Sequence, residues 1–462
     1  MRSPGRGVKG RGGLDHPESP GRSSCIFRSG AILLSNDRPK RRRERAIIVG
    51  VILPEQSPTI VDEHLDELAK LCEAAGGEVV GRIVQERRSP DAATFIGKGK
   101  VEELKLLADE TKAGLAVFDD DLSPAQARNL EKRTEIPIVD RSGLILDIFA
   151  RRARSREART QVELAQMKYM LPRLTRAWSH LERQAGGIGT RGVGETQLEL
   201  DRRIVRERIR RLGEDLTKIE KTRETQRKGR ELAFTIALVG YTNAGKSTLF
   251  NRLTSGDAFA WDQLFATLDA KLQKSLAPMP RETVFIDTVG FIRKLPHHLI
   301  ASFRSTMGEA AEADLVLHVI NLAHTHVEDQ RDVGRVLLKE LGVKEENILE
   351  VYNKVDAVPQ PSFLERTGRD AVTVSALTGQ GVGNLLERIR RIELAAGEIV
   401  HLALPQSEGR LAARLHEIGI VHERIELEDR VALTAWIPRE LLGPYEPFRT
   451  DARVLDTGST GS

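Results

Sequence analysis

The sequence predicts a multidomain α/β protein, and three observations point to this class. Its 462 residues are too many for one typical domain, because about 150 residues per domain suggests three. Apolar residues make up 40% and charged residues 30%, which suits buried cores and excludes a wholly disordered chain. Strand-like and helix-like segments alternate in two separate regions, as they do in parallel sheets covered by helices.

The composition also excludes several other classes of protein. No run of about 18 or more apolar residues occurs, so we expect no membrane-spanning helix. Cys25 and Cys72 lie far apart and form no C-x-x-C motif, which excludes a disulfide scaffold and a thiolate metal site. The two cysteines fit a reducing cytosol, and we expect a cytoplasmic protein of bacterial type. We also expect the protein to be a monomer.

The net charge of +4 conceals an uneven distribution along the chain. Residues 1–46 contain 12 Lys/Arg and 4 Asp/Glu, and residues 151–230 contain 22 and 11. The rest of the chain therefore has a net charge of −15. A basic segment between acidic regions suits a polyanionic partner, although a solvated charged helix has the same composition.

Residues 1–45 are expected to form a disordered basic tail, because they are rich in Gly, Arg, Ser and Pro and lack apolar periodicity. The start of this tail faintly resembles a transit peptide, so organellar import stays an alternative to a plain flexible tail. The tail is also the one feature that suggests a weak membrane association.

Residues 46–149 are expected to form a small parallel α/β domain. The predicted strands cover 47–53, 79–84, 115–118 and 136–140, and the predicted helices cover 61–75, 100–110 and 123–133.

Residues 150–232 predict a long antiparallel helical hairpin. One helix-like stretch runs from about Leu144 to Gln184 with a kink at Pro172, and a second runs from about Glu195 to Lys228. Apolar residues recur every seven positions in the second stretch, which is typical of a coiled-coil seam. The glycine-rich tip covers 186–194, and each arm reaches roughly 50 Å. A helical linker packed on a neighbouring domain is the alternative.

Alternation resumes over residues 233–397, with the clearest strands at 234–240, 283–290, 314–320 and 348–353. Residues 398–462 predict a small α+β domain with a strand at 401–405, a helix at 408–418 and two strands within 421–437.

The segment Gly240 to Ser247 reads GYTNAGKS and matches the pattern GxxxxGK[ST] between a predicted strand and an apolar helix. In this setting the glycines let backbone N–H groups turn inward around phosphate oxygens. Lys246 would reach the β- and γ-phosphates, and the Ser247 hydroxyl would bind Mg²⁺. The segment therefore predicts a P-loop for a nucleoside triphosphate.

Three further segments follow predicted strands and favour GTP over ATP. DTVG (287–290) would place Asp287 near Mg²⁺ and the Gly290 amide near the γ-phosphate. The Asp356 carboxylate of NKVD (353–356) can accept two hydrogen bonds from guanine, a pair that adenine does not offer. Backbone N–H groups of SAL (375–377) can read the guanine O6. Four such segments at strand ends predict a Ras-like P-loop G domain with a mostly parallel sheet.

Three single residues refine this prediction. In FATLD (265–269), Thr267 is the expected switch threonine for Mg²⁺ and the γ-phosphate, because Thr254 lies too close to the P-loop helix. Phe291 stands where Ras-like enzymes orient the attacking water with glutamine, so we expect slow intrinsic hydrolysis. The Asn243 side chain either binds a monovalent cation such as K⁺ or braces the P-loop.

The expected catalytic residues are Lys246, Thr267 and Gly290, and the expected Mg²⁺ ligands are Ser247, Thr267 and Asp287. The residues expected to contact GTP or GDP are Gly240, Tyr241, Thr242, Asn243, Ala244, Gly245, Lys246, Ser247, Thr248, Phe265, Ala266, Thr267, Asp287, Thr288, Val289, Gly290, Asn353, Lys354, Val355, Asp356, Ser375, Ala376 and Leu377.

Several longer strings resemble the HflX family of ribosome-associated GTPases, over roughly residues 46–400 and more loosely beyond. They include FIGKGKVEEL, FDDDLSPAQARNLE, VDRSGLILDIFARRARSREARTQVELAQ, GGIGTRGVGETQLELDRR and DTVGFIRKLP. The resemblance implies a GTPase that binds the large ribosomal subunit and splits stalled or idle ribosomes under stress. It places the hairpin tip near the peptidyl-transferase centre. The tip residues expected to contact RNA are Gly187, Gly189, Arg191, Gly192 and Gly194.

Two other functions remain open at this point. A ribosome-assembly GTPase would act on precursor large subunits, and a membrane-associated GTPase would use the basic tail. No amphipathic or lipidation signal supports the second of these alternatives.

Overall fold

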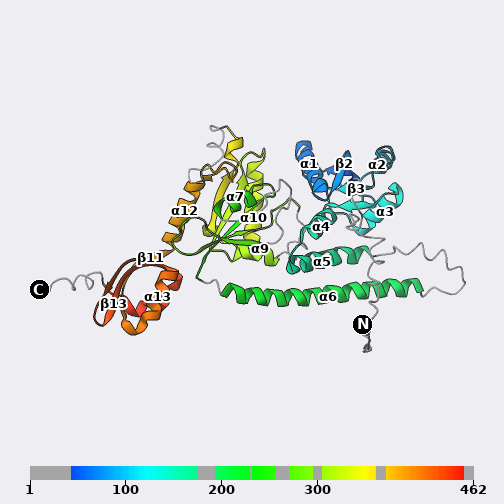
Figure 1. Cartoon of the computed structure of the whole chain (residues 1–462). Coiled ribbons are helices and arrows are strands. Elements are labelled where there is room, and N and C mark those ends of the chain that lie inside the picture. Colours follow the sequence, from blue (N-terminus) through cyan, green and yellow to red (C-terminus); the bar gives the residue numbers. More distant parts are fainter. Residues whose placement is uncertain are drawn as a thin grey trace, which may run out of the picture.

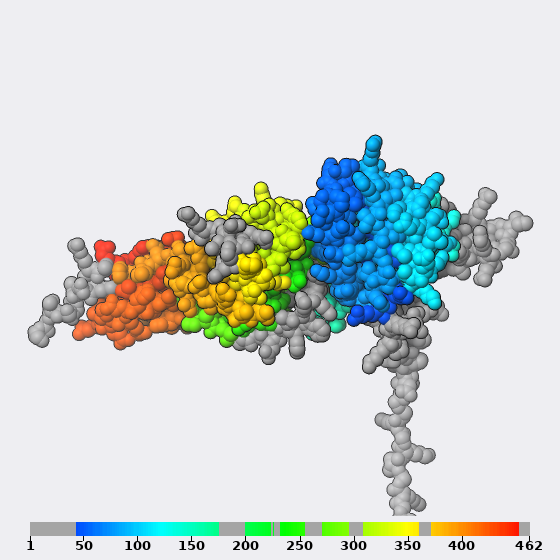
Figure 2. Space-filling model, turned by 90° about the horizontal axis from the view of Figure 1, so that it is seen from above, coloured from blue at the N-terminus to red at the C-terminus, as the bar shows by residue number. Residues whose placement is uncertain are grey.

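The computed structural model describes residues 43–174, 193–228, 232–254, 270–294, 304–359 and 371–451. The molecule is elongated, with the C-terminal domain at one end, the G domain in the middle and the N-terminal α/β domain at the other (Figure 1). Seen from above, the N-terminal domain abuts the G domain (Figure 2). No helix among the described residues is long and apolar enough to cross a membrane.

The N-terminal domain is a four-stranded parallel sheet in the order β2-β1-β3-β4. Apolar residues of α1, α4 and α5 cover one face, and those of α2 and α3 cover the other. The helix starts follow from the sequence, since Ser57 caps α1 and Ser123 forms a capping box with Gln126 in α3. Its elements are β1 Glu44–Ile52, α1 Pro58–Ala74, β2 Gly77–Glu86, α2 Lys98–Thr111, β3 Leu115–Phe118, α3 Pro124–Thr134, β4 Ile138–Asp140 and α4 Arg141–Arg152.

The first arm of the predicted hairpin is not one helix. It is divided into α4 and α5 (Arg156–Met170), followed by a short 3₁₀ helix η2 (Leu171–Arg173). Ala153 has extended backbone after α4, and the Ser155 hydroxyl caps the new helix by accepting from the Ala158 N–H. The prediction of a continuous helix from Leu144 was therefore wrong, and both α4 and α5 pack in the core of the N-terminal domain.

The second arm is α6, Val193–Lys228, which packs against α5 and runs along the molecule (Figure 1). The predicted seam residues Val205 and Leu212 are buried. Because α6 begins at Val193, the last two residues of the predicted tip, including Gly194, are helical rather than part of a loop. Gly187, Gly189, Arg191 and Gly192 lie outside the described residues.

The G domain has a six-stranded sheet in the order β10-β9-β8-β5-β7-β6, parallel except for the edge strand β6, which the sequence did not predict. Its elements are β5 Phe234–Gly240, α7 Lys246–Leu253, β6 Lys271–Lys274, β7 Thr283–Asp287, α9 Arg304–Ala311, β8 Leu315–Asn321, α10 Val327–Glu340, η3 Glu345–Asn347, β9 Ile348–Asn353, η4 Val355–Ala357, β10 Val372–Thr373 and α12 Val382–Ala395.

The C-terminal domain is a three-stranded antiparallel sheet with α13 packed on one face. Leu232, which follows α6 in the chain, also packs against this core. Its elements are β11 Gly397–Pro405, η5 Gln406–Glu408, α13 Gly409–Ile418, β12 Ile420–Glu426, β13 Arg430–Pro438, η6 Arg439–Leu441 and η7 Gly443–Phe448.

Candidate nucleotide-binding site

The four predicted nucleotide segments meet at the carboxyl edge of the G-domain sheet. GYTNAGKS follows β5, DTVG begins at the end of β7, NKVD begins at the end of β9, and SAL follows β10. Since β5 lies between β7 and β8, and β8 pairs with β9, the ends of these parallel strands face one edge. This is the edge at which open α/β sheets hold their ligands.

The P-loop backbone needs glycine at two positions. Gly240 has φ +146 and Gly245 has φ +90, and both lie in the region that side chains avoid. A Cβ on Gly240 would lie 2.1 Å from the Val319 carbonyl oxygen, and one on Gly245 would lie 2.2 Å from Asn353 Nδ2. The loop therefore approaches two neighbouring strands more closely than any side chain would allow.

Lys246, the first residue of α7, is buried beneath this loop. Its ammonium group donates to the carbonyl oxygens of Gly240 and Tyr241, at 3.0 Å each. Burial lowers the pKa of Lys246 to about 8, while the nearby Asp287 opposes the shift. The cation is thus aimed into the curve of the loop, where a phosphate would meet it.

Two oxygen groups lie together beside the P-loop. The Ser247 hydroxyl donates to Asp287 Oδ2 at 2.8 Å, and Asp287 is fully buried at the end of β7. A hydroxyl and a carboxylate are hard oxygen donors of the kind that Mg²⁺ prefers, so these residues fit that ion. Thr267, the third expected ligand, lies outside the described residues, as do Phe265 and Ala266.

The NKVD segment is tied to the P-loop by side chains. Asn353 donates to the Ala244 carbonyl at 2.8 Å and accepts from the Ala376 N–H at 2.9 Å, so it joins three segments of the predicted site. The Asp356 side chain is exposed at the edge. Lys354 donates to Asn243 Oδ1 at 3.3 Å, which favours the bracing alternative for Asn243.

The DTVG segment lies directly against the P-loop. A Cβ on Gly290 would be 2.8 Å from the Thr242 methyl carbon and 2.9 Å from Lys246 Nζ. Phe291 is hydrogen-bonded on both sides, because its N–H donates to Gly240 and its carbonyl accepts from Thr242, at 2.9 and 2.7 Å. Its side chain is buried in the G-domain core with Val239 and Ile286.

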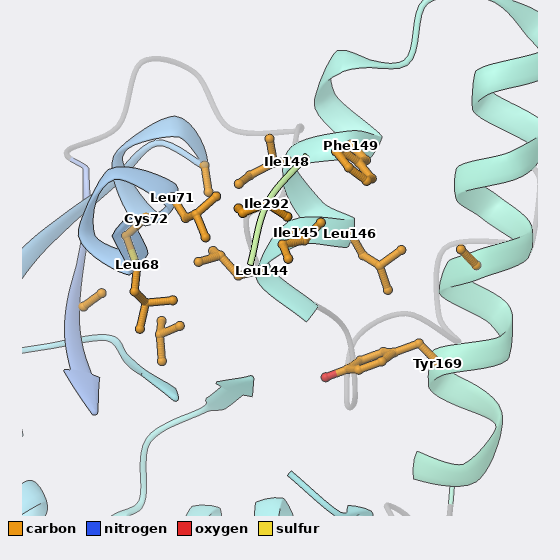
Figure 3. Close-up of a cluster of buried hydrophobic side chains, with 14 of the residues drawn as sticks. Leu68, Leu71, Cys72, Leu144, Ile145, Leu146, Ile148, Phe149, Tyr169 and Ile292 are labelled. Carbon is orange, nitrogen blue, oxygen red and sulfur yellow. The ribbon is translucent and has the colours of Figure 1, made fainter. Parts of the chain in front are cut away.

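The DTVG segment and the residues just after it also contact the N-terminal domain. Val289 and Ile292 belong to the same buried cluster as α1 and α4, and Figure 3 shows Ile292 beside Leu144, Ile145 and Ile148. The Tyr241 hydroxyl donates to Glu67 of α1 at 2.9 Å and accepts from the Arg293 N–H at 2.7 Å. A P-loop residue, the segment after DTVG and the neighbouring domain therefore meet at one hydroxyl.

Buried charged side chains also contribute to the contact between the N-terminal domain and the G domain. Arg141 donates from Nε to the Arg293 carbonyl oxygen at 3.2 Å and pairs with Glu67 at 3.0 Å and with Asp119 at 2.6 Å. Lys294 pairs with Asp119 at 2.7 Å, and Asp120 also accepts from it. Burial and the two acids Glu67 and Asp119 act in opposite directions on Arg141, and its pKa ends above the usual value.

Sequence reasoning missed this interdomain contact. Tyr241 was expected only as a P-loop residue, and the strings FDDD and VDRSG, which contain Asp119 and Arg141, had no assigned partner. An arginine directly after a predicted strand is a weak signal, since its partners Glu67 and Asp119 lie 74 and 22 residues away in the chain.

The strand order, the glycine geometry and the convergence of the four segments define a P-loop GTPase of multidomain α/β architecture. Family models described as GTP-binding GTPase N-terminal, GTP-binding GTPase Middle Region and 50S ribosome-binding GTPase match residues 62–150, 152–230 and 235–354.

Two curated relatives are named GTPase HflX. The one from Caldanaerobacter subterraneus is 44% identical over 404 residues, covering 87% of this chain and 92% of the relative. The one from Escherichia coli K12 is 43% identical over 406 residues, covering 86% and 94%. The chain therefore belongs to the HflX family of GTPases and hydrolyses GTP. A solved GTP-binding protein from Sulfolobus solfataricus, in complex with GDP, is 24% identical with a TM-score of 0.41, covering 76% of this chain and 98% of that one.

Proposed function

We propose that this GTPase binds the large ribosomal subunit and separates stalled or idle ribosomes into subunits, and that the helical hairpin is the part that enters the ribosome. The observation that carries the proposal is α6. Its 36 residues span about 54 Å at 1.5 Å per residue, a reach that suits a large RNA partner. The family model for the G domain, described as 50S ribosome-binding GTPase, points to the same partner.

The exposed surface of α6 supports an RNA partner. Arg203, Arg206 and Arg208 are exposed along the helix, and the wider segment 151–230, which also contains α5, carries 22 basic against 11 acidic side chains. Some of these arginines have acidic neighbours, such as Arg208 with Glu163 at 2.7 Å. Exposed pairs of this kind contribute little to stability, so the arginines remain available to RNA phosphates.

In the nucleotide site, Lys246 contacts the β- and γ-phosphates, and the Gly290 N–H meets the γ-phosphate. Ser247 and Asp287 would hold Mg²⁺, with Thr267 as the third expected ligand. When bound there, the ion would supply positive charge against the negative charge of the phosphates. Asp356 accepts hydrogen bonds from guanine, and the backbone of Ser375 to Leu377 faces its O6. The proposed active protein is a cytoplasmic monomer.

The DTVG segment and the residues just after it couple the nucleotide site to the N-terminal domain. Gly290 touches the phosphate-binding Lys246, while Val289, Ile292 and Arg293 contact the N-terminal domain that carries the hairpin. A γ-phosphate that repositions Gly290 would strain these contacts. GTP would therefore shift the N-terminal domain and hairpin between two arrangements, and hydrolysis would reverse the shift.

The test is sedimentation of ribosomes on sucrose gradients with this protein and GTP, a non-hydrolysable analogue or GDP. We expect subunits to accumulate with GTP and the protein to migrate with the large subunit in the triphosphate states. Association only with precursor large subunits would instead support the assembly alternative. Flotation with anionic vesicles distinguishes the membrane alternative.

A variant of the hairpin tip tests the role of the hairpin. Replacing residues 186–194 by a Gly/Ser linker should abolish splitting and leave GTP binding nearly unchanged, because all the predicted nucleotide segments follow residue 239. Splitting at the wild-type rate by this variant would contradict the proposed role of the tip.

A further inference from the structure

Arg252 connects the two halves of the nucleotide site. It lies near the end of α7, the helix whose first residues are Lys246 and Ser247 at the phosphate end. Its guanidinium donates from Nε to the Ala376 carbonyl at 3.3 Å and from Nη2 to the Leu377 carbonyl at 2.6 Å. One fork thus holds two consecutive carbonyl groups of the turn that follows β10.

The turn is stabilised by hydrogen bonds and by the burial of Ala376 in the G-domain core. Ser375 is fully buried, its carbonyl accepts from the Gly379 N–H at 2.8 Å, and its hydroxyl accepts from the Thr378 N–H at 3.0 Å. Leu377, at the centre, is 72% exposed, so its side chain contributes little packing. The position of the central peptide therefore depends strongly on the groups that hold its carbonyl.

Because the peptide is planar, this contact also fixes the direction of the Leu377 N–H group. The carbonyl of Ala376 and the N–H of Leu377 belong to one trans peptide and point in opposite directions. With the carbonyl held by Arg252, the Leu377 N–H points away from α7. The Ala376 N–H is held separately by Asn353, the first residue of the NKVD segment. The two side chains together fix the turn relative to both the P-loop helix and the predicted guanine site.

We propose that Arg252 is a positioning residue that sets the discrimination between guanine and adenine nucleotides, by holding the Ser375–Leu377 turn against the O6 side of the base. This inference rests on the proposed assignment of that turn to guanine. Arg252 acts through the turn and touches neither the base nor the phosphates. Its loss should weaken guanine recognition and leave the phosphate end of the site intact.

The test compares Arg252→Met and Arg252→Lys with wild type in nucleotide affinity and steady-state hydrolysis. Arg252→Met keeps an unbranched, flexible side chain, although a shorter one, and removes both donors. We expect its Kd for GDP and its KM for GTP to rise about 10-fold, since two charge-assisted hydrogen bonds are lost, with kcat within about twofold. Its Kd for ADP should not change, because adenine has no O6. The GDP-over-ADP preference should fall by the same factor, with an intermediate value for Arg252→Lys.

Arg390→Met is a matched control. Arg390 also donates two hydrogen bonds to a backbone carbonyl of the G domain, that of Pro278, at 3.0 and 2.6 Å. We expect Arg390→Met to leave the preference between GDP and ADP unchanged. An Arg252→Met protein whose GDP-over-ADP preference stays within twofold of wild type, or which binds GDP and ADP more weakly by the same factor, would overturn the inference.

The substitution Asp356→Asn distinguishes a failure of the role of Arg252 from a failure of the predicted guanine site. If it changes base preference while Arg252→Met does not, the guanine site stands and only the role of Arg252 fails. If Asp356→Asn has no effect either, the assignment of the base site itself fails.

Discussion

The N-terminal domain and the G domain both end their parallel strands in short polar segments, but those segments have different partners. In the G domain the P-loop approaches its neighbours through Gly240 and Gly245, and the ends of β7 and β9 carry Asp287 and Asn353. In the N-terminal domain Asp119 follows β3 and Asp140 ends β4. Both of these acids are buried and paired within the protein.

Asp140 is an acid at the end of a strand whose two oxygens both accept hydrogen bonds from the protein itself. Its two oxygens accept hydrogen bonds from Gly143, Leu122, Tyr169 and Arg173, and Arg173 also stacks on the Tyr169 ring. Polar residues at strand ends are therefore not sufficient to define a ligand site. In one sheet they surround a glycine loop, and in the other they hold helices and the adjoining domain in place.

The largest expected effect concerns the buried ion pairs of Arg141 in the N-terminal domain. Arg141→Met leaves Glu67 and Asp119 without their shared cation, and breaking a buried ion pair costs about 3–5 kcal/mol. Amide hydrogen exchange in α1 and β3 should accelerate by at least about 100-fold, which corresponds to the lower end of that range.

Arg82→Met is the control, because the Arg82–Asp66 pair is exposed and should contribute less than about 1 kcal/mol. Equal acceleration of exchange in the two variants would mean that Arg141 has no special structural role.

The second prediction concerns the pH dependence of stability that follows from one buried acid in each of the two domains. Burial raises the pKa of Asp147 to about 6, while the Arg151 side chain opposes the shift. Burial raises the pKa of Glu393 in α12 to about 7, with Arg281 opposing it. Because the folded state holds these protons more tightly than the unfolded state, stability should fall as pH rises from about 4 to about 7.

For Glu393 the loss in free energy of unfolding is on the order of 3 kcal/mol. Glu393→Gln should remove that part of the pH dependence in thermal unfolding between pH 4 and 8. An unchanged pH profile in this variant would show that Glu393 does not carry the predicted proton.

A third prediction concerns base recognition in the G domain. Asp356→Asn replaces a pair of acceptors by one acceptor and one donor, so GTP affinity should fall about 100-fold and xanthosine nucleotides should be favoured. Competition binding with GDP, XDP and ADP measures this change. Asp332→Asn on α10 is the exposed control. Wild-type protein that binds ATP as tightly as GTP would contradict the predicted role of Asp356.

The smallest expected effect concerns Asn243. Its side-chain oxygen accepts from Lys354, so Asn243→Ala should raise the Kd for GDP only about twofold. Hydrolysis should proceed at equal rates in K⁺ and Na⁺ if bracing is its whole role. A preference for K⁺ that disappears in the variant would instead identify Asn243 as a cation ligand.

Much of the fold could be predicted from local patterns. The strands at 115–118, 234–240 and 348–353 have the predicted bounds, because each is a short apolar or β-branched run between turn residues. The break between α4 and α5 was missed, because a helical period continues across it, although both helices pack in the same core of the N-terminal domain. The edge strand β6, with the sequence KLQK, has no apolar run to reveal it.

The sequence by itself determined the nucleotide segments of this protein, because glycine and lysine at fixed spacing after a strand permit few other backbone paths. Only the tertiary structure decided where Tyr241, Arg141 and Arg252 act. Each of them forms its decisive contact with a residue more than 20 positions away, such as Glu67, Asp119 and Ala376. Hydrogen bonds and ion pairs over such separations depend on how the helices and strands pack, and the local spacing of residues does not predict that packing.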